Sequence, residues 1–146
     1  WLYWRVGNWE VYAKMMINYD HWSEVPRTWS AWPWQFFKPK EVACRGTGKL
    51  SISDNLMGKL ELLRGRFGSP LNLSSVFRSP YHNAKVGGSP RSMHLFGLAA
   101  DIPTVGKDRY LVKQLAKDLG FAGFGYYRTF LHIDLGRKRE WGKWDA

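Results

Sequence analysis

The amino-acid sequence predicts an α+β domain with a small antiparallel sheet and helices packed on one of its faces. Residues 97–102 and 130–135 alternate their side chains with the period of a β-strand. Residues 54–67 and 108–119 repeat apolar side chains at helical spacing, and a glycine follows each of these segments. The length of 146 residues suits one domain with a substantial core.

The first part of the chain differs from the rest in its aromatic content. Seven of the nine tryptophans lie within residues 1–36. We therefore expect a tryptophan-rich N-terminal extension over residues 1–31 and the main domain over residues 32–146. Packing of the aromatic rings on the domain is one use of this extension, and binding of a glycan or a partner protein is the other.

Three short elements are expected between the extension and Arg78. Residues 37–44 predict a helical turn that starts at a proline, although the preceding lysine supplies no capping side chain. The helix that follows begins at Ser53 or Asp54, both of which are favourable N-capping residues. Residues 71–77 indicate a partly polar strand that leads directly to Arg78.

The stretch from His94 to Asp101 is the most informative part of the sequence. Within the predicted strand over residues 97–102, the side chains of Gly97, Ala99 and Asp101 share one face. The carboxylate therefore has only small neighbours on its face, which leaves room for a bulky group beside it. The loop before this strand carries His94.

A second strand with a matching polar face lies near the C-terminus. Within residues 130–135, His132 and Asp134 point to one side, and leucine and isoleucine side chains point to the other. Pairing of the two strands brings His132 close to Asp101. The shared face of the two strands then carries one imidazole and two carboxylates, and the loop before the first strand adds the imidazole of His94.

The remaining segments complete the predicted fold. The amphipathic helix over residues 108–119 connects the two strands. Residues 123–127 predict a further strand, whose glycines allow close backbone approach. The basic tail over residues 137–146 is expected to cover the sheet.

Two histidines and one aspartate in this arrangement suit a zinc site. A catalytic zinc ion commonly keeps three protein ligands and a water molecule, whose pKa it lowers to about 7. We therefore expect His94, Asp101 and His132 to bind Zn²⁺ and to leave a fourth position open to water. Alternatively, His94 caps a loop and Asp101 pairs with an arginine, but the joint pattern favours the metal site.

Composition and charge limit the classes of partner. The formal charge of +10 and a pI near 9.9 call for an anionic partner, such as nucleic acid or the carboxylates and phosphates of a bacterial cell wall, although solubility alone also explains such a charge. We find no base-reading motif that supports nucleic acid. The single cysteine, Cys44, excludes an internal disulfide and a cysteine-based zinc site. The sequence has no run of 18 apolar residues, so we expect no membrane insertion.

These motifs resemble those of a known family of zinc enzymes. The pattern Ser92-x-His94-x-x-Gly97-x-Ala99-x-Asp101, followed by His132-x-Asp134, resembles peptidase family M15, subgroup A. That subgroup contains zinc D-Ala-D-Ala carboxypeptidases and endopeptidases, and its relatives include phage endolysins and the zinc-bearing Hedgehog domain. The resemblance extends from about Trp32 to Trp144. It implies a zinc fold like that of these peptidases and of Hedgehog, with His94, Asp101 and His132 as the metal ligands.

The resemblance also implies an activity and a substrate. It points to a zinc metallopeptidase that hydrolyses the peptidoglycan stem peptide, as a D,D-carboxypeptidase or an endopeptidase. Arg78 then contacts the substrate and stabilises the oxyanion, with a salt bridge to Asp101 or Glu41 as its alternative role. Tyr81, His82 and Ser92 are the further candidates for substrate binding, although His82 and Ser92 equally suit the stabilisation of their loops.

The general base is the least certain part of this site. Several members of the subgroup place an acidic residue three positions before the last histidine ligand, and this chain has Thr129 there. Asp134 is the best substitute, because it shares a strand face with His132. Its alternative role is to orient His132 as a ligand.

The expected setting is a bacterial cell wall. No basic-then-apolar signal segment opens the sequence. We therefore expect a phage- or prophage-encoded, endolysin-like monomer that is made in the cytoplasm and acts on peptidoglycan at the cell wall or in the periplasm. The alternative is a zinc-stabilised module that binds the cell wall, or belongs to a virion, without catalysis.

Overall fold

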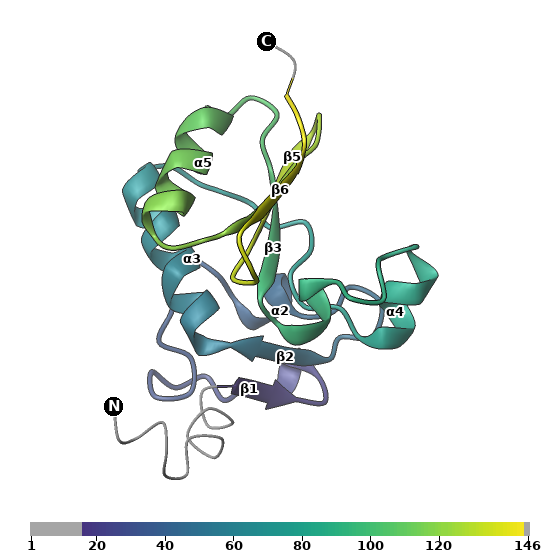
Figure 1. The fold of residues 1–146 in the computed structure, drawn as a ribbon. Coiled ribbons are helices and arrows are strands. Elements are labelled where there is room, and N and C mark those ends of the chain that lie inside the picture. Colours follow the sequence, from purple (N-terminus) through teal and green to yellow (C-terminus); the bar gives the residue numbers. More distant parts are fainter. Residues whose placement is uncertain (1–15, 145–146) are drawn as a thin grey trace, which may run out of the picture.

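A computed structural model describes residues 16–144 of the chain (Figure 1). Its strands are β1 (Met16–Tyr19), β2 (Leu50–Ser53), β3 (Ala99–Pro103), β4 (Gly123–Tyr126), β5 (Phe130–Asp134) and β6 (Arg139–Gly142). Its helices are α2 (Pro39–Val42), α3 (Asp54–Phe67), α4 (Pro80–Lys85) and α5 (Arg109–Asp118), with the short 3₁₀ turns η2 (Trp22–Glu24) and η3 (Met93–Phe96). Within this range, no helix is both long enough and apolar enough to cross a membrane. The mixture of small sheets and helices confirms the α+β class.

The main sheet has the strand order β3-β5-β4-β6. Strands β3, β5 and β4 pair antiparallel, as predicted, but β6 pairs parallel with β4. The expectation of a purely antiparallel sheet is therefore wrong at this edge. Since β4 already occupies the place beside β5, the returning chain forms β6 on the outer side of β4.

Two glycines of β4 make room for β6. A side chain at Gly123 would overlap the carboxylate of Asp134 and the guanidinium of Arg139, and a Cβ atom at Gly125 would lie 2.6 Å from the ring of Trp141. The parallel edge therefore depends on the absence of side chains at these two positions. The glycines were expected to allow close backbone approach, and the structure shows that they make room for the side chains of neighbouring strands instead.

The N-terminal part of the described chain adds a small second sheet. Strand β1 pairs antiparallel with β2, from Met16 opposite Ser53 to Tyr19 opposite Leu50. The predicted division of the chain after residue 31 stays a prediction. The expected packing of residues 1–15 lies outside the described residues.

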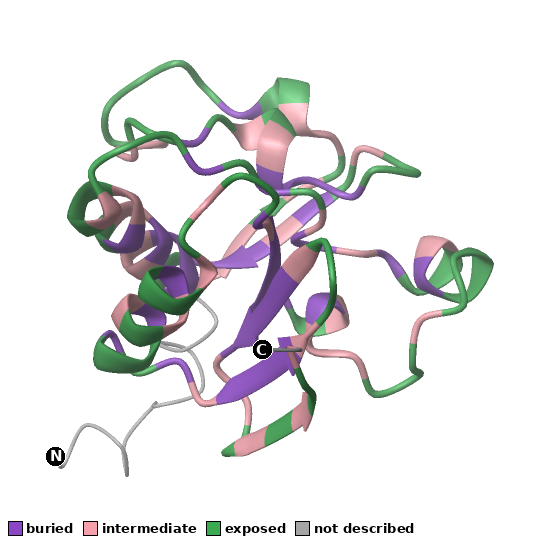
Figure 2. Ribbon diagram, turned by 90° about the horizontal axis from the view of Figure 1, so that it is seen from above, coloured by how far each residue is buried: buried purple, intermediate pink, exposed green. Residues whose placement is uncertain are grey.

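The two long helices cover the apolar face of the main sheet. The hydroxyl of Ser53 caps α3 and the carboxylate of Asp108 caps α5, as the sequence predicted for Ser53. The helices pack against each other, and their buried sides join Leu131 and Ile133 of β5 in one apolar core. Figures 1 and 2 show these helices on one side of the buried strands, with their outer sides exposed. Helices therefore occupy one face, as predicted, and the opposite face is left for His132 and Asp134.

Two predicted elements differ from the structure. Residues 71–77 form no strand, and only Ser75 makes an isolated bridge, to Asp101. The segment nevertheless runs along β3, because the amide of Asp101 donates to the carbonyl of Ser75 over 2.8 Å. The strand predicted from residue 97 begins only at Ala99, because Gly97 ends η3 in the left-handed conformation, with φ = 66°. Ala99 and Asp101 still share a face.

Gly97 provides a stability test of this chain path. Substitution Gly97→Ala forces a side chain into a left-handed backbone position and into the carbonyl oxygen of Ser51. We expect the free energy of unfolding to fall by about 2 kcal/mol or more, measured by urea denaturation. The matched control is Gly68→Ala, which has φ = 81° but no atom within 4 Å of the new Cβ, and which isolates the backbone cost of about 1 kcal/mol. Equal losses for the two variants would contradict the tight packing at Gly97.

Candidate metal centre

His94 lies in η3, buried, with one ring nitrogen fixed by the backbone. Its Nδ1 atom lies 2.6 Å from the carbonyl oxygen of Val76, which can only accept a hydrogen bond, so Nδ1 carries the proton. In the neutral ring, Nε2 therefore presents a lone pair. That atom lies 3.2 Å from Oδ1 of Asp101. Ser92 stabilises the turn, because its hydroxyl accepts a hydrogen bond from the amide of His94.

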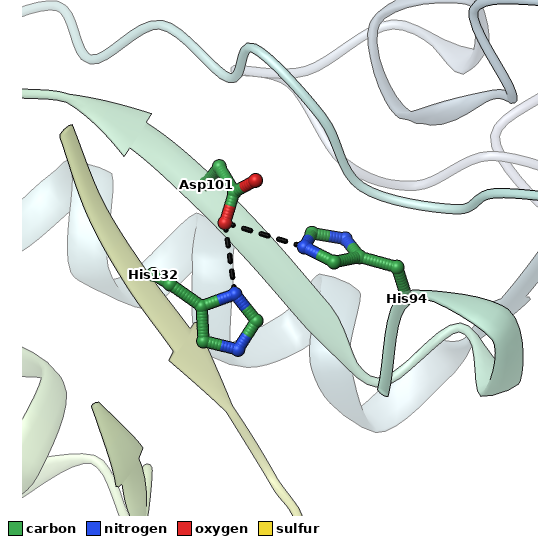
Figure 3. A group of neighbouring side chains, drawn as sticks. All are labelled: His94, Asp101 and His132. Atoms are coloured by element: carbon green, nitrogen blue, oxygen red, sulfur yellow. Dashed lines mark hydrogen bonds and ion pairs between the residues drawn. The ribbon is translucent and has the colours of Figure 1, made fainter. Parts of the chain in front are cut away.

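Asp101 and His132 face each other across the β3–β5 ladder. They are register partners, and Oδ1 of Asp101 lies 2.9 Å from Nδ1 of His132. Figure 3 shows both imidazoles directed at this one carboxylate oxygen. One donor atom from each of the three residues lies within 4.8 Å of the others, and all three residues are buried.

The second ring nitrogen of His132 contacts a further carboxylate. Its Nε2 atom lies 2.7 Å from Oδ2 of Asp134. Burial lowers the pKa of the His132 imidazole, but the hydrogen bonds and charges of Asp101 and Asp134 outweigh it, and the pKa is raised above 6.5. Burial likewise raises the pKa of Asp101, but hydrogen bonds from His132 and His94 lower it from 3.8 to about 2. The Nδ1 position of His132 thus takes either a proton or another cation.

These contacts provide a test of whether a metal ion fits. With neutral rings fixed by Val76 and Asp134, the inner nitrogens of His94 and His132 both direct lone pairs at an anionic oxygen. Such a convergence of electron pairs requires a cation, which is either a proton on these nitrogens or one metal ion that takes its place. Two imidazoles and a carboxylate are donors that suit Zn²⁺. The three residues therefore fit a metal site, by the chemistry and the direction of their donor atoms.

Asp134 is fully buried, and its carboxylate is surrounded by groups that donate hydrogen bonds to it. It accepts hydrogen bonds from the guanidinium of Arg139 at 2.9 and 2.7 Å, from the amide of Gly136 at 2.9 Å and from His132. Burial raises its pKa, but these hydrogen bonds outweigh burial and hold the pKa far below its ordinary value. The carboxylate is also absent from the cavity lining. This geometry favours the orientation of His132 over the role of general base, the two roles that the sequence left open.

A cavity of about 810 Å³ opens beside the three donors. Among the predicted residues, Arg78, Ser92, His94, Asp101 and His132 line it. Tyr81 and His82 do not line it: the Tyr81 ring is 70% exposed, and the His82 ring lies against Gly46. Their predicted contact with substrate has no support in this geometry.

Arg78 is held in the wall of this cavity by three neighbours. Its Nη2 atom lies 3.4 Å from Oδ2 of Asp101, Nε donates to Ser75 over 3.0 Å, and Nη1 donates to Asn83 over 3.4 Å. Of the two salt-bridge partners considered from the sequence, Asp101 is the one in contact. The guanidinium is thus a fixed cation next to the metal donors.

The sequence reasoning missed the contribution of β6. Arg139 binds Asp134, and the Trp141 ring lies 5.0 Å from the His132 ring, centroid to centroid. Both line the cavity, together with Tyr127 and Arg137. The sequence signal for these residues is their spacing. Arg139 and Trp141 are two residues apart, as are Gly123 and Gly125, the β4 glycines that they pack against.

Comparisons with known proteins agree with this site. A family model described as Peptidase M15 matches residues 21–134, a range that contains His94, Asp101 and His132. The zinc D-Ala-D-Ala carboxypeptidase of Streptomyces albus G is 33% identical over 91 residues, which cover 58% of this chain and 36% of that relative. This chain thus spans little more than a third of that relative's length.

The role of Asp134 is tested by Asp134→Ala. If Asp134 orients His132, metal affinity falls by about 10- to 100-fold, measured by competition with a chromophoric chelator. The control is Asp118→Ala, which removes an exposed carboxylate of α5 and leaves the affinity unchanged. Full metal affinity combined with abolished turnover would instead identify Asp134 as the base.

The affinity for metal is also expected to depend on pH. A proton and a metal ion compete for Nδ1 of His132, whose pKa is raised above 6.5. At pH values above this raised pKa, the protonation of His132 no longer changes the affinity for metal. At pH values below it, the affinity for metal falls by about tenfold per pH unit. Calorimetric titrations between pH 5 and 9 measure the profile. An onset of loss well below pH 6.5 contradicts the contacts described for His132.

Proposed function

This chain belongs to the peptidase M15 family, and on that premise we propose that it is a zinc-dependent peptidase of bacterial peptidoglycan stem peptides. The proposed reaction is hydrolysis of a peptide bond, as a D,D-carboxypeptidase or an endopeptidase. The observation that carries the proposal is the convergence of His94, Asp101 and His132 beside an open cavity. The relative from Streptomyces albus G is a zinc D-Ala-D-Ala carboxypeptidase, which supports the zinc ion and a substrate that contains D-Ala-D-Ala.

The three donors are the proposed zinc ligands. His94 offers Nε2, His132 offers Nδ1 and Asp101 offers Oδ1. When bound, zinc supplies a Lewis acid that polarises a carbonyl group and lowers the pKa of a water molecule. The outer hydrogen bonds, to Val76 and Asp134, fix the tautomer and the direction of each ring.

Arg78 is the proposed group that stabilises negative charge on the scissile carbonyl. Its guanidinium lines the cavity and is held by Asp101, Ser75 and Asn83, so it loses little further freedom when a substrate binds. A fixed cation beside developing negative charge lowers the barrier to attack. The salt bridge to Asp101 and the substrate contact are thus compatible roles of one side chain.

The cavity also supports a second candidate function. Asp101 is the one carboxylate residue that lines it within the described part of the chain, and neither Thr129 nor Asp134 is among the lining residues. A peptidase without a separate carboxylate base has a weaker means of removing the proton from water. A zinc-stabilised, non-catalytic cell-wall or virion module is therefore the second candidate.

The proposed place of action is the cell wall or the periplasm. The formal charge of +10 suits attraction to a surface that carries carboxylates and phosphates. The phage or prophage origin, the endolysin role and the monomeric state remain part of the proposal.

Purified sacculi distinguish the two candidates. The zinc-loaded protein is expected to release peptide fragments or free D-alanine. We expect 1,10-phenanthroline to abolish this release and added Zn²⁺ to restore it. Mass spectrometry of the fragments identifies the bond that is cleaved. The control is His94→Ala, which removes one donor and is expected to be inactive. Binding to sacculi without release of fragments or of D-alanine would reject the peptidase in favour of the non-catalytic module.

Arg78 is tested separately by Arg78→Gln. Loss of the cation next to the oxyanion is expected to lower kcat by about 10²- to 10³-fold with a smaller change in KM. Because Arg78 also contacts Asp101, chelator competition must show that the variant still binds metal. A metal-loaded variant with undiminished kcat contradicts the proposed role.

A further inference from the structure

The cavity beside the metal donors is rich in arginine. Four arginines line it, Arg78, Arg91, Arg137 and Arg139, and Asp101 is the single acidic residue in the described lining. A bound divalent cation adds further positive charge. The electrostatic character of this cavity is therefore strongly cationic.

Two of these four arginines are already engaged by buried carboxylates. Arg78 contacts Asp101, and Arg139 contacts both oxygens of Asp134. These two arginines already have roles at the metal centre: Arg78 as the proposed group that stabilises the oxyanion, and Arg139 as the partner of Asp134.

The other two arginines have no such partner. Within residues 16–144, neither Arg91 nor Arg137 forms a salt bridge, a side-chain hydrogen bond or a contact with an aromatic ring; Arg91 uses its amide and Arg137 its carbonyl. Both are exposed, yet both border the cavity. Their guanidinium groups are therefore available to a ligand.

Arg91 and Arg137 belong to two segments that lie side by side. Arg91 precedes Met93 in the loop before η3, and Arg137 follows Gly136 in the turn after β5. A Cβ atom at Gly136 would lie 3.0 Å from Sδ of Met93, so the loop and the turn are in contact. Arg91 and Arg137 therefore border the same cavity from two neighbouring segments.

We propose that Arg91 and Arg137 form a carboxylate-binding subsite beside the metal centre, which selects stem peptides whose non-terminal carboxylate, on the D-glutamyl or the diaminopimelate residue, is free rather than amidated. This inference rests on the proposed peptidase function and names its substrate class. Arginine suits this task, because its planar guanidinium forms paired hydrogen bonds with a carboxylate. A carboxamide at the same position offers no charge and only one acceptor oxygen, so it is bound less well.

Matched pairs of synthetic stem pentapeptides test the subsite. One pair differs only in the α-carboxylate of the D-glutamyl residue, free or amidated, and another only in the side-chain carboxylate of diaminopimelate, free or amidated. For the zinc-loaded protein, we expect kcat/KM to be about tenfold or more higher for the free acid in at least one pair. The variants are Arg91→Gln, Arg137→Gln and the double substitution, and Arg66→Gln is the control, because it removes the same charge from an exposed site on α3.

The double variant is expected to hydrolyse both members of the selective pair at the rate of the amidated peptide, whereas Arg66→Gln keeps the preference. Equal rates for acid and amide in the unsubstituted protein, or a preference that survives the double substitution, would overturn the subsite. If no peptide is hydrolysed, the peptidase proposal fails separately. Calorimetric binding of the same peptides then decides the subsite: tighter binding of the free acid, lost in the double variant, supports it, and equal binding rejects it.

Discussion

The direction of two imidazole lone pairs toward one buried carboxylate oxygen is the constraint on which the site depends. The β3–β5 register sets Asp101 opposite His132, and η3 brings His94 to the same oxygen. The carbonyl of Val76 decides which nitrogen of His94 is protonated. Because unprotonated nitrogens would direct lone pairs at an anionic oxygen, this position takes either protons or a metal ion.

The outer support of the centre comes from the C-terminal edge of the sheet. Asp134 fixes His132, and Arg139 fixes Asp134 through both carboxylate oxygens. Arg139 reaches Asp134 because Gly123 has no side chain, and Trp141 packs beside His132 over the equally bare Gly125. The parallel β6 strand is thus part of the metal centre as well as a sheet edge. Its Arg139 and Trp141 side chains also line the cavity beside the three donors.

The sequence predicted the local features of this protein and missed those that depend on distant contacts. The approach of His132 to Asp101 followed from strand alternation, because a period of two fixes which side chains share a face. His94 was expected from the loop that precedes the strand, and it lies in η3. The position of β6 could not be predicted in this way, because a strand of four residues is too short for its alternation to be recognised. Its pairing also depends on glycines of β4 that lie earlier in the chain. The role of Asp134 depends on Arg139, whose contact is likewise non-local. Residues 71–77 follow β3 through single hydrogen bonds rather than a ladder, because their polar side chains give no continuous strand face.

The account is tested most directly by locating the metal in a crystal of the zinc-loaded protein, with anomalous diffraction data collected on both sides of the zinc absorption edge. The predicted result is a single strong anomalous peak in contact with Nε2 of His94, Oδ1 of Asp101 and Nδ1 of His132. A peak elsewhere, or crystals without zinc in which the three side chains still contact one another directly, would contradict the central claim.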